Sequence, residues 1–353
     1  MSDSPEHSSI PKGSHTLNMP NEEVKSARSQ EPLSWKKGLE KTAYGFSMGT
    51  ANVIPGVSGG TMALVHGIYK DLIEAIRSAN LEFAKNIFQL KWKRAFKILH
   101  WRFLLPVGLG VVIAVVSLAR VIPYFLEHHR APICAMFFGL ISASAVLIGR
   151  EIEKWSLPAL ITGVLFTAGS FVLVGLLPVQ TPDAMWFIFL TGFVSFMAML
   201  LPGLSGAFVL LVLGKYTYIL NAVQELAYHG RLQALIPLGV FALGSIVGVL
   251  CLARVLSHFL EHYRSATMAA LVGLMLGSLR KLWPWREVEE WTKVGEKTIP
   301  LEEANRIPAS LDTEVLVSVG LFIVGVFLIM IFEKIAHRKS DAGKQEKTEP
   351  AEG

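Results

Sequence analysis

Two apolar segments of this chain are too long for one membrane crossing, and each is broken near its middle by a Pro-Gly pair. The first covers residues 42–78 and contains the stretch NVIPGVSGG, and the second covers residues 184–222 and contains the stretch AMLLPGLSGA. Proline ends the helix that precedes it, and glycine permits backbone angles that other residues avoid. Each segment therefore predicts a re-entrant hairpin of two helical arms that enter and leave a membrane on the same face.

Further apolar segments approach the length of about 20 residues that a single helical crossing needs. They cover residues 103–123, 132–149, 157–178, 233–253, 266–282 and 313–332. The chain is 52% hydrophobic and only 17% charged, whereas a soluble domain has about 25% charged residues. The segments do not alternate between apolar and polar residues as barrel strands do. The predicted fold class is therefore an all-α polytopic membrane protein.

The two halves of the chain resemble each other. The stretch IPGVSGGTMALVHGIY at 54–69 matches LPGLSGAFVLLVLGKY at 201–216, and LARVIPYFLEHHR at 118–130 matches LARVLSHFLEHYR at 252–264. Each half consists of one re-entrant hairpin and three crossings, and an odd number of crossings inverts the second half relative to the first. The sequence thus predicts an inverted repeat, which is a common plan of secondary transporters.

The predicted organisation has two membrane repeats between two tails. Residues 1–38 and 336–353 are polar, and they are predicted to be disordered. The first repeat covers residues 39–180 and the second covers residues 181–335. Because cytoplasmic loops are rich in Lys and Arg, the basic N-terminal tail places both termini in the cytoplasm of a multi-pass inner-membrane protein.

Two connecting segments have a composition of their own. Residues 80–102 combine apolar residues at helical spacing with several Lys and Arg, which predicts an amphipathic helix on the cytoplasmic surface, against anionic membrane lipids. A solvated connector is the alternative. Residues 283–312 are predicted to form an outer loop. Because the basic clusters flank apolar segments, no nucleic-acid partner is expected.

Small and hydroxyl residues follow each Pro-Gly break, where a new half-helix begins. The first N–H groups of a helix have no intrahelical partners, and with the positive end of the helix dipole they attract an anion. The alternative is that the breaks only kink the helices and that the small residues only pack them closely. The candidate substrate-binding residues are Asn52, Pro55, Gly56, Ser58, Gly59, Gly60 and Thr61 in the first half, and Pro202, Gly203, Ser205 and Gly206 in the second.

Several charged or titratable residues are further candidates. Arg120 and Arg254 occupy the same position in the repeated LAR, and a planar guanidinium can bind two oxygens of a phosphate. Their alternative role is interfacial snorkelling. His66 is either a proton carrier or a structural histidine. The pair His258 and His262 lacks a third ligand in the sequence pattern, so no metal and no cofactor is expected.

The paired motifs resemble those of the polyprenyl-phosphate transporter family, formerly a domain of unknown function. The resemblance rests on GTANVIPGVSGGTMAL and LLPGLSGAFVLLVLGKY, and it covers roughly residues 40–335. It implies a flippase that returns undecaprenyl phosphate across the bacterial cytoplasmic membrane for reuse in cell-envelope glycan synthesis. It also implies that the Pro, Gly and Ser residues of the two motifs bind the substrate. The second motif departs from the first by carrying Ala207 where the first has Gly60.

The direction of transport bears on its energy source. An anionic headgroup that moves inward opposes the membrane potential by about 2.3 kcal/mol per charge per 100 mV. Coupling to protons or another cation by alternating access is therefore expected. The sequence contains no Walker-type phosphate loop, which argues against ATP as the driver.

Two other functions remain open from the residues alone. One is a transporter or channel for a small anion, because a helix-end anion site would suit it equally. The other is a membrane phosphatase that acts on a lipid pyrophosphate. The sequence does not bring together the nucleophile and base, or the metal cluster, that such an enzyme needs. The protein is therefore expected not to be an enzyme.

Overall fold

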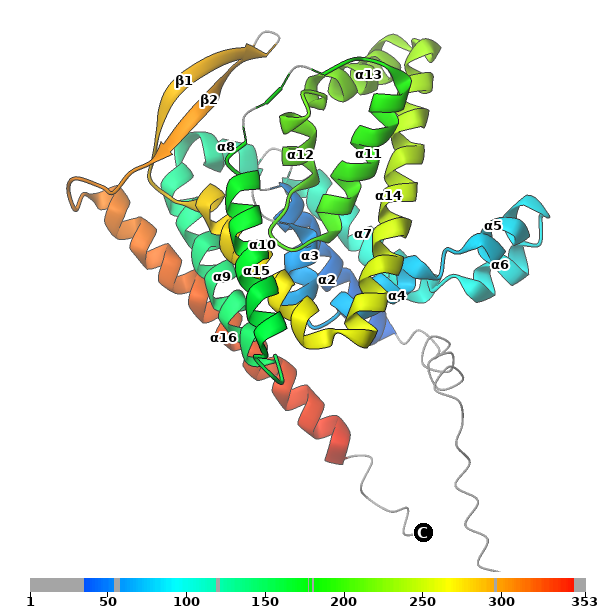
Figure 1. Cartoon of the computed structure of the whole chain (residues 1–353), viewed down its shortest axis with the longest axis horizontal. Helices are drawn as coiled ribbons and strands as arrows, with labels where there is room; N and C mark the ends of the chain where they lie inside the picture. Colours follow the sequence, from blue (N-terminus) through cyan, green and yellow to red (C-terminus); the bar gives the residue numbers. More distant parts are fainter. Residues whose placement is uncertain are drawn as a thin grey trace, which may run out of the picture.

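The structure is a computed structural model that describes residues 35–53, 58–118, 121–176, 178–179, 181–294 and 297–345. The described part is mostly helical (Figure 1). The helices of the first half are α2 (Trp35–Val53), α3 (Gly59–Val65), α4 (Tyr69–Arg77), α5 (Leu81–Phe88), α6 (Trp92–Ile98), α7 (Trp101–Leu118), α8 (Val121–His128), α9 (Arg130–Arg150) and α10 (Leu157–Leu173). The second half contains α11 (Met185–Leu200), α12 (Gly206–Val212), α13 (Tyr216–His229), the short 3-10 helix η1 (Leu232–Ala234), α14 (Leu235–His262), α15 (Arg264–Leu282), β1 (Arg286–Val294), β2 (Lys297–Asn305) and α16 (Thr313–Gln345).

Four of these helical stretches are long and apolar enough to cross a membrane. They are α7, α9, the continuous stretch Leu232–His262, and Thr313–Ile331 of α16. A broken pair, α12 with the first part of α13, is bent by 107° and would make a fifth. Helices α10 and α11 are apolar but shorter. This count by length and composition confirms a helical, multi-pass membrane protein.

Glycine residues bring the long helices together in tightly packed pairs. Helix α2 packs on α7, and α11 packs on α14. Gly45 of α2 lies against the carbonyl of Val107, and Gly192 of α11 lies against the carbonyl of Phe241. Helices α9 and α16 form a third pair and α10 and α15 a fourth, again with glycines at the contact. In a membrane, such small residues allow close backbone approach and give the packing that holds helices together.

Each of the two long apolar segments folds into three helices rather than the two arms predicted from the sequence. The extra turn comes at Gly67, with φ +69°, and at Gly214, with φ +64°. Both values lie in the left-handed region that favours glycine. As a result α3 and α12 have seven residues each, or a length of about 10 Å, and α4 and α13 follow at an angle. This second break was not predicted from the sequence.

The segment 283–312, predicted as an outer loop, contains a two-stranded hairpin within an otherwise mostly helical structure. Its strands β1 and β2 pair antiparallel, from Arg286 opposite Asn305 to Val294 opposite Lys297. Two residues, 295–296, separate the strands and lie outside the described residues. A connection of this length suits a tight β-hairpin, and charged and apolar residues alternate along parts of both strands.

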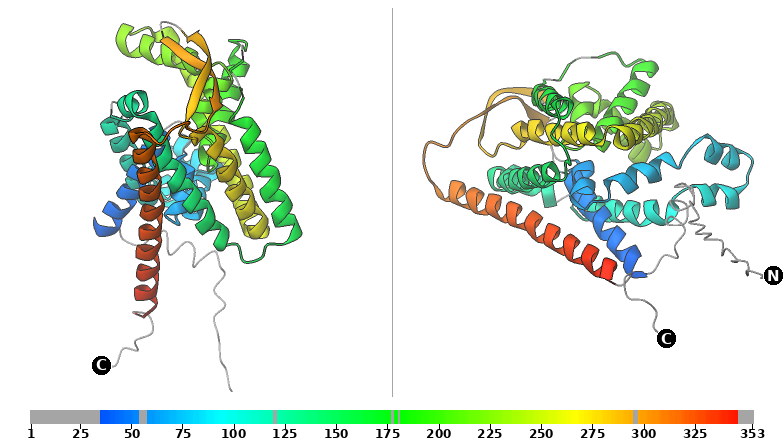
Figure 2. Two further views of the ribbon diagram at one scale, coloured as in Figure 1. Left: turned by 90° about the vertical axis from the view of Figure 1, so that its left-hand side faces the viewer. Right: turned by 60° about the horizontal axis from the view of Figure 1, so that its bottom comes forward.

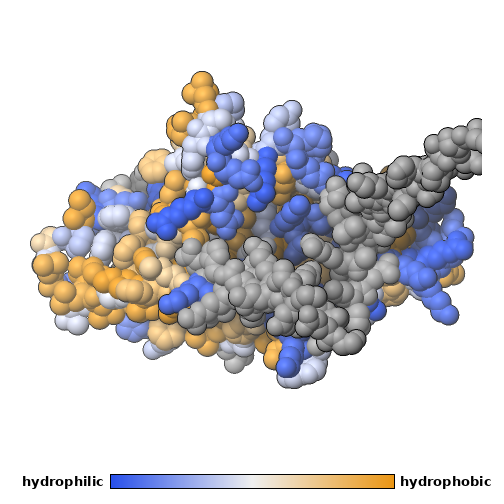
Figure 3. Space-filling view, turned by 90° about the horizontal axis from the view of Figure 1, so that it is seen from below, coloured by the Kyte–Doolittle hydropathy of each residue, from blue (hydrophilic) through white to orange (hydrophobic). Residues whose placement is uncertain are grey.

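The predicted single surface helix over 80–102 is also corrected, because α5 and α6 form a folded-back pair here called the arm. The chain turns at Leu90, a non-glycine residue with φ 55°. No glycine or proline marks this turn in the sequence. The arm projects from the helical body (Figures 1 and 2). Its apolar side chains Leu81, Phe88 and Trp92 are exposed. Seen from below, hydrophilic residues gather on the arm at the right (Figure 3).

The two ends of the described chain lie on the same side of the molecule. The start of α2 and the end of α16 are at the bottom of Figure 1, whereas the β-hairpin is at the top. Helix α2 begins at Trp35, four residues inside the predicted N-terminal tail. Helix α16 continues to Gln345, so the tail predicted to be disordered from residue 336 is helical for its first part.

Candidate functional site

The two Pro-Gly segments meet inside the helical body. We call residues 58–61, at the start of α3, the first tip, and residues 201–207, which lead into α12, the second tip. Ser58 is the N-cap of α3, and its Oγ accepts a hydrogen bond of 3.1 Å from the Gly60 N–H. The Gly59 N–H donates to Asn52 Oδ1 of α2 at 2.7 Å. The donors at the first tip are therefore largely satisfied within the first half of the chain.

The first half also caps the carbonyls that α11 leaves free where it ends before Pro202. The Ser58 Oγ donates to the Met199 carbonyl at 2.9 Å. The Tyr69 hydroxyl, which is buried, donates to the Leu200 carbonyl at 3.1 Å. The last carbonyls of a helix have no intrahelical partner, so these two side chains satisfy acceptors across the boundary between the repeats.

A third contact joins the tips at Gly203. Its N–H donates to Thr61 Oγ1 at 2.9 Å, and Thr61 is fully buried. Gly203 has φ +80°, which favours glycine. A Cβ at this position would lie 2.7 Å from Ser278 Oγ and 2.8 Å from the Leu274 carbonyl, both on α15. The backbone of the second tip is thus fixed between α3 and α15.

The second tip differs from the first in its unused polar groups. Ser205 is the N-cap of α12, but its side chain makes no capping hydrogen bond. It is only 7% exposed. Within the described residues, neither its hydroxyl nor the N–H groups of Gly206 and Ala207 have a hydrogen-bond partner. The equivalent Ser58 makes two. Among the described residues of the two tips, these polar groups of the second tip are the ones available to an anion.

Of the two charged candidates, the structure describes Arg254. The Arg254 guanidinium is exposed and donates to the Leu250 carbonyl of its own helix at 3.2 Å. Pro55, Gly56 and Arg120 lie outside the described residues. Among the described residues, Lys281 of α15 places its ammonium group 5.4 Å from the ring centroid of Phe208, which follows the second tip.

His66 is the C-cap of α3, so it lies at the opposite end of that helix from the first tip. Its Nε2 is 2.9 Å from Ser47 Oγ, and its ring centroid is 4.8 Å from that of Tyr44. The Tyr44 hydroxyl in turn donates to Glu40 at 2.6 Å. This row of polar residues follows α2 away from the tip.

Known proteins resemble the chain closely enough to assign its family. A family model described as undecaprenyl phosphate translocase-like matches residues 48–298. A polyprenyl-phosphate transporter of Vibrio cholerae is 35% identical over 310 residues, which cover 83% of this chain and 96% of the relative. The chain belongs to the undecaprenyl phosphate translocase-like family. A polyprenyl-phosphate transporter of Staphylococcus aureus is 30% identical over 254 residues, or 68% of this chain and 84% of the relative. No solved structure matches the chain.

In this translocase-like chain, sequence reasoning missed two residues at the tips. Tyr69 could have been found from the sequence, because the repeated motifs both end in tyrosine, Tyr69 in the first and Tyr216 in the second. Lys281 could not, because it lies far from either motif in the sequence and reaches the tip only through the packing of α15.

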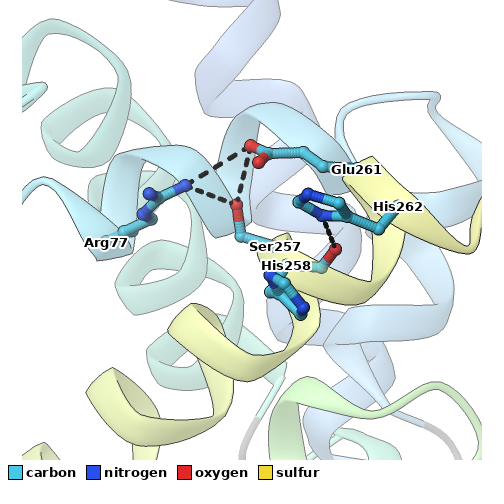
Figure 4. Close-up of polar contacts among 5 residues, drawn as sticks. All are labelled: Arg77, Ser257, His258, Glu261 and His262. Carbon is cyan, nitrogen blue, oxygen red and sulfur yellow. Dashed lines mark hydrogen bonds and ion pairs between the residues drawn. The ribbon is translucent and has the colours of Figure 1, made fainter.

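This protein also has a polar cluster between its two halves, at the lower end of α14 (Figure 4). The Arg77 guanidinium of α4 donates to Ser257 Oγ at 2.8 Å and lies 3.4 Å from Glu261. Ser257 is buried and also donates to Glu261 at 3.3 Å. The rings of His258 and His262 lie beside the cluster, with centroids 4.3 Å apart. Among the described residues, no three His, Cys, Asp or Glu side chains are placed to hold a metal ion.

Proposed function

We propose that the protein is a flippase that carries undecaprenyl phosphate from the outer to the inner leaflet of the bacterial cytoplasmic membrane. The observation that carries the proposal is the meeting of two broken helices, one from each half, with unused polar groups at the second tip. Such a site suits a phosphate headgroup, while the apolar tail of the lipid stays in the bilayer. The names of the two relatives support the same substrate class.

The internal packing supports an inverted repeat. The contact of Gly45 with Val107 and that of Gly192 with Phe241 join equivalent positions, related by the same offsets as the repeated motifs. The later helices exchange partners between the halves: α9 of the first packs on α16 of the second, and α15 packs on α10. A two-fold relation between the halves accounts for both patterns, and it fits alternating access.

The distribution of charge supports cytoplasmic termini. The basic arm, the start of α2 and the end of α16 share one side of the molecule, while residues 181–183, on the other side, contain neither Lys nor Arg. The positive-inside rule then places the arm in the cytoplasm. Its exposed Phe88 and Trp92, beside several lysines, suit the surface of an anionic leaflet.

The phosphate binds first at Ser205 and Gly206 in this proposal. Pro202 and Gly203 shape the backbone there. Ser58, Gly59, Gly60, Thr61 and Asn52 are engaged with protein partners in the present conformation, and they become available when the tips separate. Pro55, Gly56 and Arg120 remain sequence-based expectations, and Arg254 would reach a headgroup only at the membrane surface.

The polar cluster supports a cytoplasmic gate. Arg77 of α4 belongs to the first half and Glu261 of α14 to the second. Helix α4 and the lower end of α14 lie on the side that carries the basic arm (Figure 1). In the repeated motifs, Gln224 is the equivalent of Arg77, and Pro123 is that of Ser257. The charged contact therefore has no equivalent of the same chemistry at the outer end.

Inward transport of the anion is coupled to a cation gradient in this proposal, with protons as the first candidate.

Cross-linking tests the gate. In a background with both native cysteines replaced, Arg77→Cys and Glu261→Cys are joined by a short bifunctional thiol reagent. We expect the joined protein to transport at least tenfold more slowly, because the two halves can no longer separate at the cytoplasmic end. Each single-cysteine variant treated with the reagent is the control. An unchanged rate in the joined protein would show that this end does not open.

Substrate specificity tests the proposed function. Binding of undecaprenyl phosphate to the purified protein is measured in competition with a short-chain polyprenyl phosphate, undecaprenol, inorganic phosphate and sulfate. We expect only the polyprenyl phosphate to compete effectively. Competition by inorganic phosphate or sulfate at similar concentrations would instead support the small-anion transporter. Release of phosphate from undecaprenyl pyrophosphate would support the phosphatase.

A further inference from the structure

The last turn of α15 brings a lysine to the second tip. Ser278 of α15 lies directly against Gly203. Lys281 comes three residues later, on the same face of the helix. Its Nζ is 5.4 Å from the centroid of the Phe208 ring. Phe208 is the third residue of α12, and Ser205 is the N-cap of that helix. The ammonium group therefore lies beside the ring of a residue in the first turn of α12.

The neighbouring cation has a different place. Arg280 donates to the Phe171 carbonyl of α10 at 3.0 Å, and its guanidinium lies 4.6 Å from the Phe171 ring centroid. It is exposed on the α10 side of α15. Both residues are basic and both lie in the last turn of α15, where a cation stabilises the helix dipole. A role at the helix end would be shared by both, whereas proximity to the second tip belongs to Lys281.

The chemistry at this place fits a phosphate monoester. A lysine ammonium is a compact charge with three donors, and it can bind a phosphate oxygen without the fixed planar geometry of a guanidinium. Lys281 is half-buried beside an aromatic ring, where less water screens its charge. The unused hydroxyl of Ser205, which is 7% exposed, supplies a neutral donor on the same turn of α12.

We propose that Lys281, together with Ser205, binds the phosphate of the lipid substrate at the second tip. This inference rests on the proposed function. It assigns to a residue of α15 the phosphate-binding role that was predicted for Arg254. It also makes the site asymmetric, because the residue equivalent to Lys281 in the repeated motifs is Leu147.

A paired substitution tests the inference. Wild type, Lys281→Met, Lys281→Arg and Arg280→Met are placed in nanodiscs of zwitterionic lipid, and binding of undecaprenyl phosphate and of undecaprenol is measured. Losing a charged donor to a phosphate weakens binding by about tenfold or more. We expect that loss for Lys281→Met with the phosphate only. Lys281→Arg should keep most of the affinity, and Arg280→Met should stay within about twofold of wild type.

Three other outcomes are informative. If Lys281→Met binds undecaprenyl phosphate as wild type does, the inference is wrong. If Lys281→Met and Arg280→Met lose affinity equally, and both lower the thermal unfolding temperature, the lysine serves the helix end and the inference is also wrong. If wild type itself does not prefer undecaprenyl phosphate to undecaprenol, the proposed function is wrong. This outcome differs from one in which wild type shows the preference and Lys281→Met keeps it, where only the inference about Lys281 is wrong.

Discussion

Replacement of Gly203 by alanine is expected to lower the free energy of unfolding by about 2–5 kcal/mol and to abolish transport. Two independent costs add at this position. A left-handed backbone at a non-glycine residue costs about 1–2 kcal/mol, and Gly203 has φ +80°. Forcing a methyl group into a packed site costs about 1–3 kcal/mol more, since the Cβ would lie 2.7 Å from Ser278 Oγ. Thermal unfolding in detergent and transport in proteoliposomes measure the two effects.

Gly230 provides the matched control for this substitution. It also has a positive φ, +61°, but a Cβ there would meet nothing within 4 Å. Gly230→Ala should therefore show only the backbone cost, about 1–2 kcal/mol, and should still transport. Equal effects of the two substitutions would contradict the tight packing of the second tip between α3 and α15.

The two N-cap serines are expected to give opposite results when each is replaced by alanine. Ser58→Ala should lower the free energy of unfolding by about 2–3 kcal/mol, because it removes a helix cap and leaves the Met199 carbonyl without its donor. Ser205→Ala should change stability by less than about 0.5 kcal/mol, since its hydroxyl bonds to no described residue. It should instead weaken the binding of undecaprenyl phosphate.

The comparison needs both readouts on both variants. Unfolding temperature and lipid-phosphate affinity are measured for Ser58→Ala, Ser205→Ala and the double variant, with undecaprenol as the lipid control. The asymmetry between the tips is contradicted if Ser205→Ala destabilises the protein as much as Ser58→Ala does. It is also contradicted if Ser205→Ala binds undecaprenyl phosphate with unchanged affinity.

Much of the architecture follows from the sequence because apolar length and helix breakers act locally. The apolar runs predicted the long membrane helices, and Pro202 marked the end of α11 correctly. Ser58 and Ser205 both lie at the N-cap positions that their place after the breaks predicted. The repeated motifs also indicated which positions in the two halves correspond.

The remaining features depend on contacts between segments far apart in the chain. Nothing near Lys281 in the sequence shows that α15 packs against the second tip. Ser58 and Thr61 hydrogen-bond to the second half of the chain instead of being free to bind a ligand. These contacts can be recognised only once the two tips are placed together. The turn at Leu90 has no local signal, because leucine rarely adopts the left-handed backbone found there.

Movement of undecaprenyl phosphate between leaflets tests directly whether the protein is a flippase of this lipid. The protein is reconstituted into proteoliposomes with a fluorescent undecaprenyl phosphate, and a membrane-impermeant quencher reports the fraction in the outer leaflet. With a proton gradient imposed, we expect rapid net movement in the wild type, at least tenfold slower movement in Lys281→Met, and near wild-type movement in Arg280→Met. Movement in the wild type no faster than in protein-free liposomes would contradict the proposed function.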